Sequence, residues 1–134
     1  MKQITIASRD YDGLTADIAT VLADNDINIE SLDAEAVDGV GLVTLTVDHY
    51  NRALHALRDA GWSAVTEDAL VLRVPDEPGA LARVAKKFKD AGVHVHSIRI
   101  IHHEGGNGII AVNATPLAKA REMVGEQILG DAVR

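Results

Sequence analysis

The chain has 134 residues, of which 47% are apolar and 25% charged, and its formal net charge is −7. This length allows one ordinary domain or two very small ones, and the acidic balance opposes binding to the negative phosphates of nucleic acid. The absence of cysteine excludes disulfides, thiolate metal sites and cysteine nucleophiles.

The first half of the chain predicts six elements in the order βαββαβ. Residues 4–8 are a short apolar strand, and after Gly13 apolar residues recur at helical spacing. The apolar positions of this helix are Leu14, Ile18, Val21 and Leu22. Residues 28–37 and 42–47 predict two strands joined by a glycine-containing hairpin turn. Asp48 is expected to cap a second helix that ends at Gly61, and residues 62–66 predict a fourth strand.

The second half repeats this order, with Gly79 standing 66 positions after Gly13. Its first helix has an apolar stripe of Leu81, Val84, Ala85 and Phe88. Gly92 is expected to adopt the left-handed conformation after this helix, where the first half has Asp26. Residues 94–103 and 109–113 predict the next strands, and Thr115 is expected to cap a helix that begins at Pro116. A last strand within residues 128–133 is only faintly indicated.

The repeated order predicts an α+β protein made of two ferredoxin-like βαββαβ units. Each unit would have an antiparallel sheet with its helices on one face, and the expected domains are residues 1–67 and 68–134. A unit of roughly 65 residues is marginal on its own, and its sheet has exposed edges. We therefore expect the two units to join each other and a homodimer to form.

Two segments of the sequence resemble the opening of ACT domains, the small amino-acid-sensing modules of metabolic enzymes. They are "DYDGLTADIATVLADNDINI" and "DEPGALARVAKKFKDAGVHV". Both follow the pattern of a strand, an acidic turn that ends in glycine, a helix, and a second strand. The resemblance covers nearly the whole chain and implies a tandem ACT-domain protein with a regulatory role, without a catalytic domain.

The turn before each first helix offers groups that suit an amino-acid ligand. Helix amides can hold a carboxylate, Gly13 and Gly79 allow close approach to the backbone, and Asp10 or Asp76 can accept bonds from an ammonium group. The resemblance to serine-sensing ACT domains implies ligand contacts at Ser8, Asp10 and Asn28, and at Val74, Asp76 and His94 in the second half. Only Asn28 has the family's residue type, so the first half is the better candidate. The opposing interpretation is that both turns are purely structural.

His94 and His96 alternate along a strand and point to one face, and His102 would join them if no bulge intervened. Imidazoles in this pattern can bind zinc, nickel or copper, and nickel-responsive repressors use an ACT-like domain with a similar pair. Those repressors also use a cysteine and a DNA-binding arm, which this chain lacks. The alternative is that these histidines lie on a polar surface or in an interface, where they could make it sensitive to pH.

The function expected from these patterns is amino-acid binding at a domain or subunit interface, with no cofactor and no intrinsic catalysis. The alternatives are an interaction-only regulatory subunit of an amino-acid biosynthetic enzyme, and a histidine-based metal sensor. The first residues do not resemble a secretory signal, and no apolar run approaches the roughly 20 residues of a membrane span. We therefore expect a cytoplasmic protein.

Overall fold

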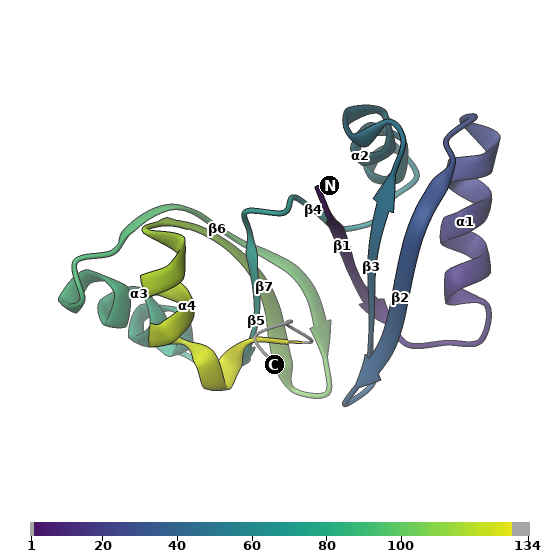
Figure 1. Cartoon of the computed structure of the whole chain (residues 1–134). Helices are drawn as coiled ribbons and strands as arrows, with labels where there is room; N and C mark the ends of the chain where they lie inside the picture. The colour runs from purple at the N-terminus through teal and green to yellow at the C-terminus, as the bar shows by residue number, and fades with distance from the viewer. Residues whose placement is uncertain (1, 130–134) are drawn as a thin grey trace. The chain divides into compact units, whose positions relative to one another are not determined.

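The computed structural model describes residues 2–129. The chain divides into two compact units, Met1–Glu67 and Asp68–Arg134, which we call unit 1 and unit 2 (Figure 1). Both units consist of an antiparallel sheet with helices, so the α+β class with two ferredoxin-like units is confirmed. No helix of the described part is both long enough and apolar enough to cross a membrane.

Unit 1 is a four-stranded sheet with both of its helices on one side (Figure 1). Its elements are β1 (Ile4–Arg9), α1 (Leu14–Asp24), β2 (Ile29–Val37), β3 (Val40–Val47), α2 (Tyr50–Asp59) and β4 (Ala64–Val65). The strand order is β2-β3-β1-β4, which places β2 at an edge. The strand β4 is shorter than the predicted range of 62–66.

The core of unit 1 lies between its sheet and its helices. Alternate residues of β1 and β3 point into it, as the two-residue period of a strand requires. The helix α1 contributes Leu14, Ile18 and Leu22, so three of the four predicted apolar positions are confirmed, while Val21 packs only at the margin.

Unit 2 has the same order of elements around a three-stranded sheet. They are β5 (Leu70–Pro75), α3 (Ala80–Asp90), β6 (His94–Glu104), β7 (Asn107–Thr115) and α4 (Leu117–Met123), followed by a 3₁₀ turn at Gly125–Gln127. The strand order is β5-β7-β6, with β6 at an edge. In place of a full fourth strand, Ile128 forms an isolated bridge with Leu72. The rest of the predicted last strand, residues 130–133, lies outside the described part of the chain.

The predicted apolar stripe of α3 is partly wrong. Val84 and Phe88 are buried as expected, but the third buried residue is Ala80, while Leu81 is 37% exposed. Ala80 stands 66 positions after the buried Leu14, so the duplication gives the correct face of the helix. The prediction placed Leu81 in the core because its apolar side chain is larger than that of Ala80. It therefore set the buried face of α3 one residue too far along the chain.

Backbone hydrogen bonds show that the two units are built alike at the first turn. The N–H of Asp10 donates to Gly39 O and that of Asp76 donates to Gly106 O, both at 2.9 Å. Gly13 and Gly79 precede the two helices with φ of 92° and 86°. This left-handed conformation is strained for any residue with a Cβ, so it explains both glycines without a ligand. The expected left-handed residues after the helices, Asp26 and Gly92, are also confirmed, with φ of 58° and 75°.

The starts of the second helices differ from the prediction by one residue each. His49 stands at the N-cap of α2, and Asp48 instead accepts a hydrogen bond from Asn28 N. Pro116 stands at the N-cap of α4, because Thr115 is the last residue of β7. The strand β7 extends two residues beyond its predicted range of 109–113, whereas β3 ends at Val47 as predicted.

Candidate ligand-binding site

Asp10 and Gly13 line a pocket of about 350 Å³ where β1 leads into α1. The other walls are the start of α1 and the second half of β2, from Ala34 to Ala36. The amides of Thr15 and Ala16, in the first turn of α1, have no acceptor within the helix, and Gly13 supplies no side-chain cap. Both residues line the pocket, so it combines helix amides with the carboxylates of Asp10, Asp12 and Glu35.

A tyrosine–aspartate pair stands beside this pocket. The hydroxyl of Tyr11 donates to Asp17 Oδ2 at 2.6 Å, and Arg9 lies over the Tyr11 ring at 5.2 Å from its centroid. The bond to Asp17, together with desolvation and the charge of that carboxylate, raises the pKa of Tyr11. The pair therefore links the turn before α1, through the Tyr11 hydroxyl, to the Asp17 carboxylate in the first turn of the helix.

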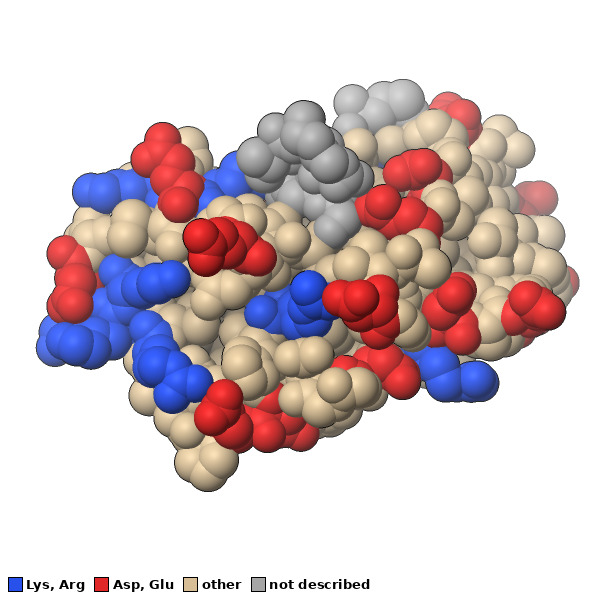
Figure 2. Space-filling model, turned by 90° about the horizontal axis from the view of Figure 1, so that it is seen from below, with Lys and Arg blue, Asp and Glu red and all other residues tan. Residues whose placement is uncertain are grey.

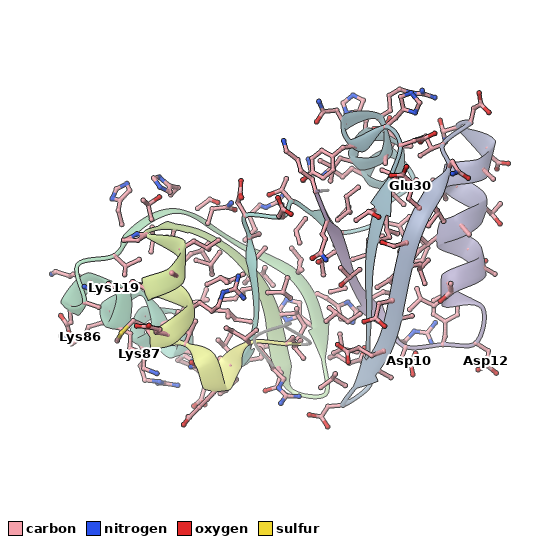
Figure 3. The ribbon with its side chains drawn as sticks, viewed as in Figure 1. Asp10, Asp12, Glu30, Lys86, Lys87 and Lys119 are labelled. Carbon is pink, nitrogen blue, oxygen red and sulfur yellow. The ribbon has the colours of Figure 1, made fainter. Side chains whose placement is uncertain are left out.

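Asn28 lies at the opposite end of α1 from this pocket. The helix has 11 residues, which separates its two ends by about 16 Å. Figure 3 shows Asp10 and Asp12 at one end of unit 1, and Glu30, two residues beyond Asn28, toward the other. The side chain of Asn28 makes no hydrogen bond with residues 2–129. Asn28 and Asp10 of one unit are therefore too far apart to contact the same small ligand.

The backbone of Asn28 is held by Asp48. Asn28 N donates to Asp48 Oδ1 at 3.0 Å, and Asp48 N donates to Asn28 O at 3.1 Å. Burial would raise the pKa of Asp48, but the hydrogen bonds from His49 and Asn28 outweigh it and hold this pKa below its ordinary value. The link fixes the place where β2 begins.

Ser8 takes no part in the pocket. It is half-buried at the end of β1, and its hydroxyl donates to Arg9 O at 3.1 Å. Of the four residues predicted to bind ligand in the first half of the chain, the structure brings only Asp10 and Gly13 together.

Unit 2 has a smaller pocket of about 210 Å³ at the matching turn. Asp76 and Gly79 line it, and His103 joins them, with its Nδ1 at 3.3 Å from Asp76 Oδ2. Exposed apolar side chains of Leu81 and Ile100 replace the Thr15 and Ala34 of unit 1. The two pockets therefore differ in chemistry, and His103 was not predicted because its counterpart in the first half is Val37.

His94 and His96 lie side by side on β6, but His102 does not join them. The two rings contact edge to face with centroids 4.7 Å apart, and His96 Nε2 lies 2.6 Å from Thr115 Oγ1. His94 pairs with Thr115 and His102 with Ile109, which separates the two histidines by about 20 Å along the strand. Two bulges intervene, and His102 bonds Glu104 at 3.0 Å. Residues 2–129 contain no group of three or more side chains placed to hold a metal.

A groove of about 480 Å³ between the end of α1 and α2 was missed by the sequence analysis. Arg52, His55 and Asp59 lie along it on one face of α2. Arg52 donates to Asn25 O at 2.7 Å and so holds the end of α1. The helical spacing of these three residues could have indicated the groove from the sequence, but the same spacing is typical of a solvated helix face.

Two consecutive ferredoxin-like units, each with a pocket where its first helix begins, define a tandem α+β protein. The sequence matches the family described as "ACT domain pair" over residues 1–131, so the chain belongs to that family, as its two motifs indicated.

Solved structures that resemble the chain include three bacterial proteins. One is a protein from Bacteroides thetaiotaomicron, with 23% identity over 96% of this chain and 90% of that chain, at a TM-score of 0.49. Another is the regulatory subunit of aspartate kinase from Thermus thermophilus in its ligand-free form, with 18% identity over 93% and 91% and a TM-score of 0.45. The third is the small subunit of acetolactate synthase from Thermotoga maritima, with 11% identity over 96% and 89% and a TM-score of 0.41. No curated protein matches the sequence.

Proposed function

We propose that this chain is a non-catalytic regulatory protein whose two domains, residues 1–67 and 68–134, sense a small amino acid. The observation that carries the proposal is the unit 1 pocket, which sets helix amides beside the carboxylate of Asp10. Membership of the ACT domain pair family supports it, because ACT domains are amino-acid-sensing modules of metabolic enzymes.

The pocket is complementary to a zwitterion. The amides of Thr15 and Ala16 and the positive end of the α1 dipole attract a carboxylate. Asp10, Asp12 and Glu35 attract an ammonium group and oppose a ligand that carries only negative charge. A free amino acid presents both groups on one carbon atom, whereas a simple anion presents only the first.

A second unit completes the site in this proposal. Asn28 has a side-chain amide with donors and an acceptor, yet it lies about 16 Å from the pocket of its own unit. A small ligand bound at Asp10 can therefore contact an Asn28 side chain only if that side chain belongs to another unit. Binding between units would favour one assembly over another and so pass the signal to a partner such as a metabolic enzyme.

The test is a thermal unfolding screen of the purified protein against the common amino acids. A ligand at 100 times its dissociation constant adds about 2.7 kcal/mol of stability. We expect Asp10→Asn to abolish the shift, because it removes the ammonium partner in unit 1. The matched control is Asp76→Asn, which changes the same position in unit 2 and should keep the unit 1 response.

An unshifted midpoint with every amino acid would contradict the proposal and favour an interaction-only regulatory subunit. Recovery of a biosynthetic enzyme with the tagged protein from cell extract would then support that rival function. A shift that survives both Asp10→Asn and Asn28→Ala would place the ligand elsewhere.

A further inference from the structure

We propose that the helix layer of unit 2 is a docking surface for a short acidic segment of a partner protein. We call it the basic helix surface, and it consists of five exposed cations on α3 and α4: Arg83, Lys86, Lys87, Lys89 and Lys119. None of the five lines the pocket of Asp10 or that of Asp76. Docking at this surface therefore goes beyond the proposed function and does not require a bound amino acid.

The first observation is that the cations of two neighbouring helices share one surface. The helix α3 buries one side chain in every turn, from Ala80 to Phe88, and its four cations stand at exposed positions between the buried ones. The helix α4 packs beside α3 and adds the exposed side chain of Lys119. Figure 3 labels Lys86, Lys87 and Lys119 at the same end of these helices.

The second observation comes from the duplication, which shows that the fold does not need these cations. The four residues of α1 at the positions of the α3 cations carry no positive charge: Asp17, Thr20, Val21 and Ala23. Together α3 and α4 contain six basic and two acidic residues, whereas α1 and α2 contain two basic and three acidic residues. In Figure 2 the lysine and arginine side chains lie mainly over unit 2. Folding alone therefore does not account for the basic helix surface.

The third observation is that these cations repel one another in the free protein. Arg83 and Lys87 stand four positions apart on α3, and Lys86 and Lys89 stand three apart. Like charges at these spacings destabilise a helix. Lys87 and Lys89 also lie in the last turn, at the negative end of the helix dipole, but α1 has no basic residue in its last turn. Carboxylates of a partner would relieve the repulsion.

Most of the surface is free to meet such carboxylates. Arg83 Nη2 lies 3.6 Å from Glu77 Oε1, and Lys86 Nζ lies 3.4 Å from Asp90 Oδ2. The other three cations of the basic helix surface make no ion pair with residues 2–129. Three lysines on adjacent helices are therefore available to a partner.

The residue types favour the carboxylates of a protein over phosphate groups. Four of the five cations are lysines, whose ammonium group is a point charge, whereas phosphate is matched best by the planar fork of arginine. A nucleic acid would also bring extended negative charge toward a chain whose net charge is −7. Arg83 and Lys89 lie about 9 Å apart along the helix axis, which matches about two turns of an acidic helix. The surface therefore fits a short acidic segment.

The test is fluorescence anisotropy of a labelled peptide of ten glutamates, titrated with the full chain at low salt and without any amino acid. The wild type should bind this peptide but not a peptide of ten glutamines, and rising salt should weaken the binding. The double variant Lys87→Glu, Lys119→Glu replaces two surface ion pairs by two like-charge contacts, so its affinity should fall about tenfold. The matched control is Lys2→Glu, Arg99→Glu, which has the same net charge and should lose less than about twofold.

Carbodiimide coupling gives a second readout, because it joins lysine amines to carboxylates in direct contact with them. Mass spectrometry of the coupled wild type should find the glutamate peptide on Lys87, Lys89 or Lys119. Attachment mainly to Lys2 would contradict the assigned surface.

A wild type that does not bind the glutamate peptide, or equal weakening in the two double variants, would overturn the proposal. Tighter binding to phosphatidylserine vesicles or to single-stranded RNA than to the peptide would overturn it in favour of a phosphate-bearing partner. Sedimentation of the protein alone tests a second copy as the occupant. An oligomer that dissociates in Lys87→Glu, Lys119→Glu would assign the surface to contact between copies and would also overturn the proposal.

Discussion

Replacing Gly41 with alanine tests how the first turn of unit 1 is packed. A Cβ at this position would overlap Leu14 Cδ2 and would stand 3.4 Å from Asp10 Cα and 3.6 Å from Arg9 O. Leu14 is only 6% exposed, so its side chain has little room to move aside. Overpacking costs about 1–3 kcal/mol, and loss of glycine flexibility in the unfolded chain returns about 0.4–1 kcal/mol. The expected net loss is about 1.3 kcal/mol, the difference between the centres of these two ranges, and at most about 2.6 kcal/mol.

The matched control is Gly108→Ala at the equivalent position of unit 2. There the nearest atom to the new Cβ is Val74 Cγ2 at 3.8 Å, an ordinary contact. This variant should be as stable as the wild type or slightly more stable. Urea unfolding followed by circular dichroism measures both variants, and Trp62, the single tryptophan, packs on the core of unit 1 and reports that unit by fluorescence. Equal stability of Gly41→Ala and Gly108→Ala would refute the packing argument.

Two further predictions concern ionisable groups. Since the pKa of Asp48 is lowered in the folded state, its contribution to stability is present above its ordinary pKa of 3.8 and is lost as the pH falls through the folded value. Asp48→Asn should therefore be less stable than the wild type at neutral pH, and urea titrations at decreasing pH should show the difference shrinking in acid; a constant difference would exclude this role. Asp17→Ala removes the acceptor that raises the pKa of Tyr11, so ultraviolet titration should show this tyrosine ionising nearer its ordinary value, with Tyr11→Phe to identify its signal.

The duplication made most of the fold predictable, because periodic apolar residues and turn glycines recur at one offset. The predictions that were wrong depend on tertiary contacts, which a local pattern of residues in the sequence does not contain. Leu81 has the apolar character of a core residue, but the backbone direction set at Gly79 turns Ala80 inward instead. Asp48 has the usual chemistry of a helix cap, but its carboxylate instead accepts a hydrogen bond from Asn28 N, just before β2.

The candidate site was less predictable than the fold. Asp10, Gly13 and Asn28 occupy neighbouring places in a family motif, yet a whole helix separates Asn28 from the other two in space. The grouping of His102 with His94 failed because six positions of β7, or about 20 Å, lie between their partners on that strand. The pairing of His103 with Asp76 depends on β6 and the β5–α3 turn approaching each other, which requires the folded sheet.

The most direct test of amino-acid sensing is calorimetric titration of the best ligand from the stability screen into the wild-type protein, Asp10→Asn and Asn28→Ala. We predict saturable binding to the wild type and its loss in both variants, because the two residues reach one ligand from different units. Undiminished binding to both variants, or the absence of binding heat with the wild type, would contradict the proposed site.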